Sequence, residues 1–285
     1  MRYESPTTTR EAAKLLAGEK GSAYVLAGGT DLLVRLKMEM IDPDLMVDIK
    51  RIPAMNEIKS TATGFTIGAA VSGAKLGQNK ALAKAWPGVV EATNLIGSDQ
   101  VQGRCTMAGN LCNASPAADS VPAMIAAGAK ANVVGKDKRR TVAVEDIPTG
   151  PGTTSLKKGE VIESILLPKR APKSGDAYLR FIPRTEMDIA VVGVAVNLTL
   201  KKGIIDSARV ALGAVAPTAI LVPEAADAII GTKLDKKALD ALAAACSAAC
   251  RPIDDKRGTI EYRTRVAGVL AKRAAKIAFK RAGGA

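Results

Sequence analysis

The chain has 285 residues, enough for two domains of ~150 residues each, and its 47% apolar and 24% charged residues are typical of a globular protein and exclude wholesale disorder. Its 41 basic and 28 acidic residues leave a net charge of +13, and the absence of histidine excludes histidine-dependent nucleophilic catalysis and histidine metal sites. The apolar runs fall short of the ~18 residues that a spanning helix needs, and the N-terminus lacks a signal-peptide core, so we expect a cytoplasmic protein without a membrane span.

Residues 1–55 predict one α/β unit, in which two helices alternate with two short strands. The helices are expected at 11–16 and 32–40, and the strands at 24–26 and 45–49. Thr8 or Thr9 can cap the first helix, and Thr30 or Asp31 the second.

Residues 56–172 predict a second α/β unit around a long polar stretch. Strands are expected at 65–70, 130–134, 140–144 and 160–167, and helices at 75–84, 87–95 and 120–128. Residues 97–113 are polar and aperiodic, which predicts a long functional loop. The short basic stretch 168–176 carries Pro, Gly and Ser and indicates a domain junction.

Residues 173–285 have a different pattern, which predicts a second domain. The apolar runs 189–200 and 207–215 are joined by Lys201-Lys202-Gly203, which predicts a β-hairpin. After Pro223 the chain is rich in alanine and helical, with breaks at Gly231 and Pro252. We therefore predict an α+β protein, with one domain at 1–172, divided into subdomains 1–55 and 56–172, and a C-terminal domain of antiparallel sheet plus helices at 173–285.

Cysteine and charge point to no metal site but leave one alternative function open. The cysteines are spaced neither as CxxC nor as an iron–sulfur motif, so we expect packing roles for Cys105, Cys112, Cys246 and Cys250. Residues 256–285 carry nine basic residues and one acid, a net +8, which is compatible with a nucleic-acid-binding or scaffolding protein. The 3% aromatic content leaves few stacking platforms for single strands.

Two small-residue turns are the most informative segments. Leu26-Ala27-Gly28-Gly29-Thr30-Asp31-Leu32-Leu33 stands between a strand and a helix, and Thr106-Met107-Ala108-Gly109-Asn110 lies in the polar stretch. Glycines let backbone N–H groups converge on an anion without obstruction by Cβ atoms, and a helix start adds a favourable dipole. Neither turn matches GxGxxG or the Walker A pattern, so each alone could be a tight connection.

Further motifs follow these turns in a characteristic order. They are Ile96-Gly97-Ser98, Leu111 to Asp119, Gly150-Pro151-Gly152, Arg184 to Ala190, Leu212 to Pro217 and Tyr262-Arg263. With the two turns, they resemble the FAD-binding medium subunit of the molybdenum hydroxylases, the group of xanthine dehydrogenase and aerobic-type carbon monoxide dehydrogenase. The resemblance covers essentially the whole chain.

The resemblance implies an FAD site on this chain, with both glycine-containing loops cradling the FAD diphosphate, and it implies neither a catalytic residue nor a metal here. By position, the cofactor-binding residues are Val25, Leu26, Ala27, Gly28, Gly29, Thr30, Asp31, Leu32, Leu33, Ile96, Thr106, Met107, Ala108, Gly109, Asn110, Asp119, Ile162 and Arg180.

The resemblance also implies partner subunits and an oxidoreductase function. A large subunit would hold the molybdenum cofactor and a small subunit two [2Fe-2S] clusters, in a dimer of heterotrimers. Electrons would pass from the clusters through FAD on this chain to an external acceptor. The substrate pocket lies on another subunit, so the substrate and the acceptor stay open.

Some positions depart from the family pattern. Ala108-Gly109 replaces two glycines, Arg180 stands where lysine is common, and Gln102-Gly103 replaces an Arg-Asn pair. Arg184 and Asp188 could form a structural ion pair or act near the flavin, and the basic C-terminal helix could face solvent or dock a partner. A free-standing FAD-dependent NAD(P)H reductase is the alternative within enzymology.

Overall fold

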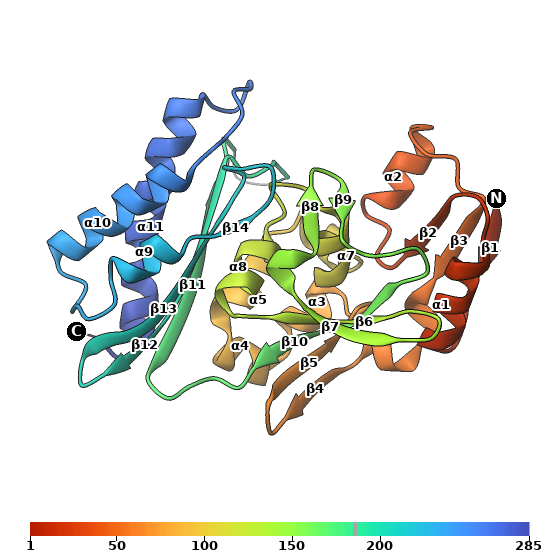
Figure 1. The fold of residues 1–285 in the computed structure, drawn as a ribbon, viewed down its shortest axis with the longest axis horizontal. Helices are drawn as coiled ribbons and strands as arrows, with labels where there is room; N and C mark the ends of the chain where they lie inside the picture. Colours follow the sequence, from red (N-terminus) through yellow and green to blue (C-terminus); the bar gives the residue numbers. More distant parts are fainter. Residues whose placement is uncertain (185–186, 285) are drawn as a thin grey trace.

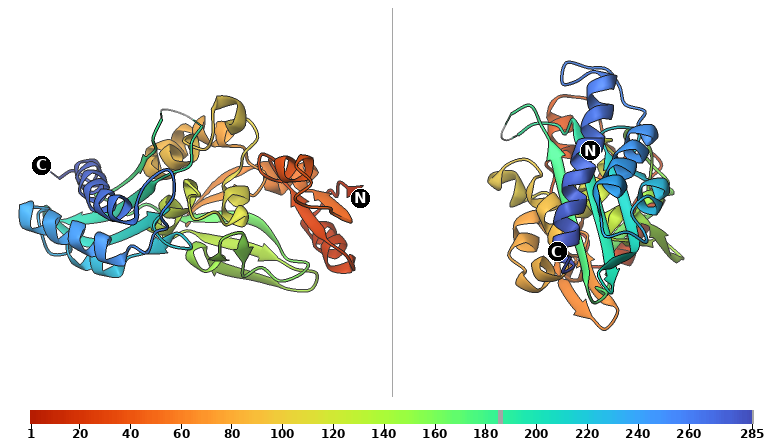
Figure 2. Two further views of the ribbon diagram at one scale, coloured as in Figure 1. Left: turned by 90° about the horizontal axis from the view of Figure 1, so that it is seen from above. Right: turned by 90° about the vertical axis from the view of Figure 1, so that its left-hand side faces the viewer.

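The computed structural model describes residues 1–184 and 187–284 (Figure 1). Among the described residues, the three larger sheets follow one another along the long axis, with the N-terminal sheet at one end and the C-terminal sheet at the other (Figures 1 and 2). No helix among the described residues is both long and apolar enough to cross a membrane. The predicted α+β class is confirmed, because the chain joins a small parallel sheet to two larger antiparallel ones.

The N-terminal unit is a parallel three-stranded sheet in the order β1-β3-β2 with two helices. Its elements are β1 (Arg2–Glu4), α1 (Thr9–Gly18), β2 (Ala23–Leu26), α2 (Leu32–Lys37) and β3 (Leu45–Asp48). Thr8 caps α1, accepting a hydrogen bond from the Glu11 N–H. Two predictions were wrong in detail: β1 was missed because three mostly exposed residues carry no alternation, and α2 ends at Lys37, before residue 40.

The middle unit is an antiparallel sheet in the order β4-β5-β10-β6-β7, with helices on the side of the C-terminal unit. Its strands are β4 (Ile58–Thr61), β5 (Gly64–Gly68), β6 (Lys130–Val134), β7 (Arg139–Ala143), the short pair β8 (Pro148–Gly150) and β9 (Thr153–Thr154), and β10 (Val161–Pro168). Its helices are η1 (Ile49–Arg51), η2 (Pro53–Asn56), α3 (Gly73–Gly77), α4 (Lys80–Ala85), α5 (Pro87–Asn94), α6 (Asp99–Gln102), α7 (Met107–Asn113), α8 (Ser120–Ala126) and η3 (Val144–Asp146).

Two predictions for this unit were wrong. The single helix expected at 75–84 is two helices, because the Asn79 side chain caps a new one by accepting from the Leu82 N–H. The loop expected at 97–113 contains α6 and α7, and Thr106 is the N-cap of α7. A seven-residue helix is too short for its hydrophobic period to show in the sequence.

The C-terminal unit is a four-stranded antiparallel sheet, and the helices that follow it in the chain cover one of its faces (Figure 2). Its elements are β11 (Ser174–Phe181), β12 (Val192–Lys201), β13 (Ile204–Gly213), β14 (Ile220–Leu221), α9 (Pro223–Asp227), α10 (Lys236–Ala249) and α11 (Ile260–Arg281). The predicted hairpin is confirmed: Lys202 (φ 54°) and Gly203 (φ 78°) make the tight turn between β12 and β13.

Strand β11 was missed because its first residues looked like part of a junction. A Cβ at Gly175 would lie 2.0 Å from the Ala278 carbonyl oxygen, so only glycine lets α11 approach this strand. Asp176 is buried. Its carboxylate is compensated by Arg170, which pairs with it at 3.0 Å, and by the Gly88 N–H, which donates to it at 2.9 Å. The formation of β11 therefore depends on tertiary contacts, which leave no pattern in the local sequence.

Buried carboxylates tie the middle unit to the C-terminal sheet. Asp119, at the start of α8, pairs with Arg180 of β11 at 2.7 Å and accepts from the Tyr178 hydroxyl at 3.1 Å. Burial raises the pKa of Asp119 to about 6 although Arg180 opposes the shift, and burial raises the pKa of Asp176 to about 6 although Arg170 opposes it.

These carboxylates predict a pH dependence of stability. Both pKa values lie above the ~3.9 of an unfolded aspartate, so between pH 4 and 6 the folded chain binds more protons than the unfolded chain. Their contribution to stability is therefore fully present below pH 4 and is lost as pH rises through 6, by about 3 kcal/mol for each group. Urea denaturation of wild type and Asp176→Asn across this range should show the wild type losing stability relative to the variant. Parallel curves would contradict this assignment.

Candidate functional site

A cleft of about 430 Å³ lies between the N-terminal unit and the middle unit. Its walls come from the β2–α2 connection, from the N-terminal half of α7, and from the segment around β9 and the start of β10. Of the predicted cofactor-binding residues, the cleft brings together Val25, Ala27, Gly28, Gly29, Thr30, Asp31, Leu32, Ile96, Thr106, Ala108, Gly109, Asn110 and Ile162. Two turns separated by about 75 residues thus face one space.

The first turn presents free backbone donors. Gly29 has φ 80°, a conformation that favours glycine, and lets the chain leave β2 sharply. Within the described residues, the N–H groups from Gly28 to Asp31 donate to no protein acceptor. A run of free N–H groups on a concave surface is suited to binding an anion such as a diphosphate.

The second turn is a capped helix start. The Gly109 N–H donates to the Thr106 hydroxyl at 2.8 Å, and the side-chain Oδ1 of Asn110 accepts from the Ser120 hydroxyl at 2.7 Å. These bonds fix the turn and leave the Asn110 amide free to donate within the described part of the chain. Ala108 does not adopt a positive φ, so its methyl group is compatible with the place of the usual glycine.

Five predicted residues do not line the cleft: Leu26, Leu33, Met107, Asp119 and Arg180. Leu26 and Met107 are buried in the core, and Leu33 is 40% exposed on α2. Asp119 and Arg180 pair with each other next to Tyr178, at the contact between the middle unit and the C-terminal sheet. Their place in a cofactor site remains a prediction from the resemblance.

Sequence reasoning missed several residues of the cleft. Tyr24, Arg35 and Glu160 line it, and so does Gly152, which the sequence analysis used only for the resemblance. Arg35 is one turn beyond Asp31 on α2, and its guanidinium lies 5.9 Å from the centroid of the Tyr24 ring. Burial raises the pKa of Asp31, and Arg35 opposes this shift. The only sequence signal for Arg35 was its spacing of four residues from Asp31, which places both side chains on the same face of the predicted helix.

Burial raises the pKa of three cysteine thiols. Cys105, Cys246 and Cys250 are buried, and burial raises the pKa of Cys105 to about 11 and that of Cys246 to about 12. A thiol is reactive as the thiolate, so these groups stay protonated at neutral pH. Among the described residues, no group of acidic residues or cysteines is arranged to hold a metal ion.

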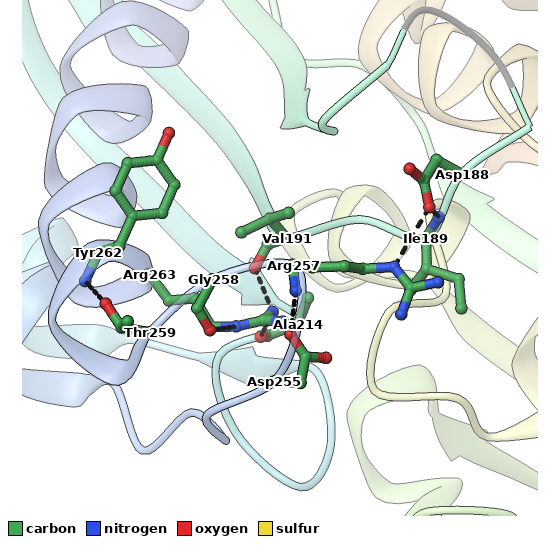
Figure 3. A network of polar contacts seen from close by, with 10 residues as sticks. All are labelled: Asp188, Ile189, Val191, Ala214, Asp255, Arg257, Gly258, Thr259, Tyr262 and Arg263. Atoms are coloured by element: carbon green, nitrogen blue, oxygen red, sulfur yellow. Dashed lines mark hydrogen bonds and ion pairs between the residues drawn. The ribbon is translucent and has the colours of Figure 1, made fainter.

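The C-terminal motifs converge on one buried network (Figure 3). Arg263 of α11 is 4% exposed, pairs with Asp255 at 2.7 Å and donates to the Val191 carbonyl at 2.8 Å and to the Ala214 carbonyl at 3.4 Å. Asp188 pairs with Arg257 at 3.2 Å. This network indicates that these motifs stabilise the fold of the C-terminal unit.

Arg184 and Asp188 are the two residues for which the sequence allowed either a structural ion pair or a role near the flavin. Arg184 lies 3.2 Å from Asp188, so the ion pair between them forms. Thr185 and Glu186 of the same motif lie outside the described residues.

Comparison with protein families gives two adjacent matches. Residues 1–170 match the model of the FAD binding domain in molybdopterin dehydrogenase. Residues 177–278 match the model of the CO dehydrogenase flavoprotein C-terminal domain. The two models together cover nearly all of the chain.

Individual relatives match over the same length. The carbon monoxide dehydrogenase medium chain of Hydrogenophaga pseudoflava is 33% identical over 279 residues, which cover 98% of this chain and 97% of the relative. The corresponding medium chain of Afipia carboxidovorans is also 33% identical, over 98% of this chain and 97% of its own. The solved structure of reconstituted CO dehydrogenase from Oligotropha carboxidovorans has a chain with TM-score 0.94 and 33% identity, covering 99% of this chain and 98% of that one.

Proposed function

We propose, since this chain belongs to the family of FAD-binding subunits of the molybdopterin dehydrogenases, that it is the flavoprotein subunit of a molybdenum-containing hydroxylase. It is then an oxidoreductase subunit, and FAD is the cofactor that binds to this chain. The observation that carries the proposal is the row of free N–H groups from Gly28 to Asp31, which faces the same cleft as the capped turn at Thr106.

The residues present fit FAD. The free N–H groups of the first turn can donate to the diphosphate, and the Asn110 amide can add a donor from the opposite wall. Arg35 supplies positive charge within the cleft, while Glu160 is already held by Arg140 at 2.7 Å and 2.8 Å. FAD, when bound, supplies the redox chemistry by accepting electrons and passing them on, and this chain's residues bind and orient it.

We further propose the partners and the organisation that the resemblance implies. The relatives are medium chains, and a medium chain implies a larger and a smaller companion. The companions would be a large subunit with the molybdenum cofactor and a small subunit with two [2Fe-2S] clusters, in a cytoplasmic dimer of heterotrimers. The chain would divide into an FAD-binding domain at 1–172, with subdomains 1–55 and 56–172, and a C-terminal domain at 173–285.

Cofactor content tests the proposal directly. The native complex should contain one FAD for each copy of this chain, and denaturation should release it as free FAD, because the groups proposed to bind it are hydrogen-bond donors of the two turns. Absorption spectra and chromatography of the supernatant measure the stoichiometry, and native mass measurement identifies the companions. Flavin that stays attached to the chain, or a chain purified without companions, would contradict the proposal; the second outcome would favour a free-standing NAD(P)H reductase.

A further inference from the structure

A basic hollow lies behind the first glycine turn, adjoining the FAD cleft at Ala27. This second cavity, of about 230 Å³, is lined by Ala27, Lys50, Asn56, Ala70, Ser72, Lys75, Gly103 and Arg104. Three of these residues are cations and none is an acid. Neither Lys50 nor Arg104 lines the FAD cleft, so neither side chain is placed to touch the cofactor.

Two of these cations bond to the backbone of the first turn. The Lys50 ammonium donates to the Ala27 carbonyl at 3.2 Å, and the Arg104 guanidinium donates to the Gly28 carbonyl at 3.5 Å. The third cation, Lys75, donates instead to the Asn56 carbonyl at 2.5 Å. Of the three cations that line this hollow, Lys50 and Arg104 are therefore the two that bond to the turn with the free N–H groups.

Lys50 is held in place by a buried carboxylate. Its ammonium lies 2.8 Å from Asp48, whose side chain is 8% exposed. Asp48 also accepts from the Lys50 backbone N–H at 2.9 Å and from the Tyr3 hydroxyl. Because Leu26 pairs with Asp48 in the parallel register of β2 and β3, the anchored ammonium lies beside the residue that begins the turn.

The geometry of the peptide unit connects these bonds to the cofactor site. In a planar trans peptide the C=O of one residue and the N–H of the next point in opposite directions. A cation that fixes the Ala27 carbonyl toward the hollow thus fixes the Gly28 N–H away from it, and a cation on the Gly28 carbonyl does the same for the Gly29 N–H. Both N–H groups are free of protein acceptors within the described residues, and both glycines line the FAD cleft.

We propose that Lys50 and Arg104 are positioning residues for FAD: by bonding the Ala27 and Gly28 carbonyls from the basic hollow, they hold the Gly28 and Gly29 N–H groups toward the diphosphate. The inference rests on the proposed FAD function and adds to it residues that act through the backbone of the turn. Lys50 has the larger effect, because its bond is shorter and its ammonium is anchored by Asp48.

The test measures FAD and riboflavin binding to the full chain after removal of flavin. Lys50→Met should weaken FAD binding about tenfold and Arg104→Met about threefold, because a hydrogen bond from a charged donor to the turn is lost. Riboflavin binding should not change, since riboflavin lacks the diphosphate. Lys50→Arg should restore most of the affinity, because it keeps a charged donor within reach of the Ala27 carbonyl.

Lys75→Met is the matched control, because it removes a cation from the same hollow without touching the turn. It should leave FAD affinity within about twofold of wild type. An equal loss in Lys75→Met would overturn the proposal in favour of a general electrostatic effect, and an equal loss for riboflavin would overturn it in favour of disrupted folding. Unchanged FAD affinity in Lys50→Met would also overturn it while the proposed function stands; a wild-type chain that binds no FAD would refute the proposed function itself.

Discussion

Gly28→Val is expected to weaken FAD binding by at least about 100-fold, because the backbone of the first turn touches the backbone before the second turn at this residue. A Cβ at Gly28 would lie 2.1 Å from the Arg104 carbonyl oxygen and 3.0 Å from the Cys105 Cα. These are backbone atoms directly before the Thr106 cap, so they cannot swing aside as a side chain would. The first turn must move instead, and its free N–H groups lose their alignment.

Flavin content after purification and FAD titration of the flavin-free chain measure this effect. Gly103→Ala is a suitable control, because Gly103 is next to Arg104 but a Cβ there would meet only the Gln100 carbonyl oxygen, at the ordinary distance of 3.4 Å. The control should bind FAD like wild type. Full occupancy by FAD in Gly28→Val would show that the contact between the turns does not position the cofactor.

Gly28 has a packing role that its sequence context does not reveal. The sequence identified Gly28 as a place where the backbone meets an anion. The structure shows that the missing side chain makes room for Arg104 and Cys105, while the residues of the turn line the cleft with N–H groups that have no acceptor within the described residues. Both turns could be found from the resemblance, but their mutual contact is a tertiary fact.

Sequence patterns predicted the elements whose formation depends on residues close together in the chain. The hairpin at Lys201-Lys202-Gly203 and the cap of α1 at Thr8 depend on local turn and capping chemistry, and both form. Strand β11 was missed because a buried ion pair decides it, and helix α7 was missed because seven residues are too few for a hydrophobic period to show. The supporting residues Lys50 and Arg104 were not predictable either, since their contacts span 23 and 76 positions along the chain.

The C-terminal motifs show the same limit in a different way. Arg184 to Ala190, Leu212 to Pro217 and Tyr262-Arg263 identified the family, yet no pattern in them revealed their role. In the structure, Arg263 draws Val191, Ala214 and Asp255 together around one guanidinium (Figure 3). Ala214 has φ 62°, an unfavourable conformation for alanine, and the bond from Arg263 to its carbonyl helps to hold it.

Arg263→Met is expected to cost about 3 kcal/mol of the free energy of unfolding, more than a hundredfold in the ratio of folded to unfolded chain. Methionine fills part of the volume but leaves the carbonyls of Val191 and Ala214 without their donor, and it leaves Asp255 without its cation. Arg263→Lys should lose less, because an ammonium can reach one or two of these oxygens but cannot span them all. Arg265→Met, at an exposed position of the same helix, should change stability by less than about 0.5 kcal/mol.

Urea denaturation separates this effect from cofactor binding. The folded fraction of Arg263→Met should retain wild-type FAD affinity, because Arg263 lies outside the residues that line the cleft. That outcome would assign the Tyr262-Arg263 motif to the stability of the C-terminal sheet and α11. The opposite pattern, with unchanged stability and weakened FAD binding, would mean that the motif acts on the cofactor and that the network around Arg263 is not its reason for being there.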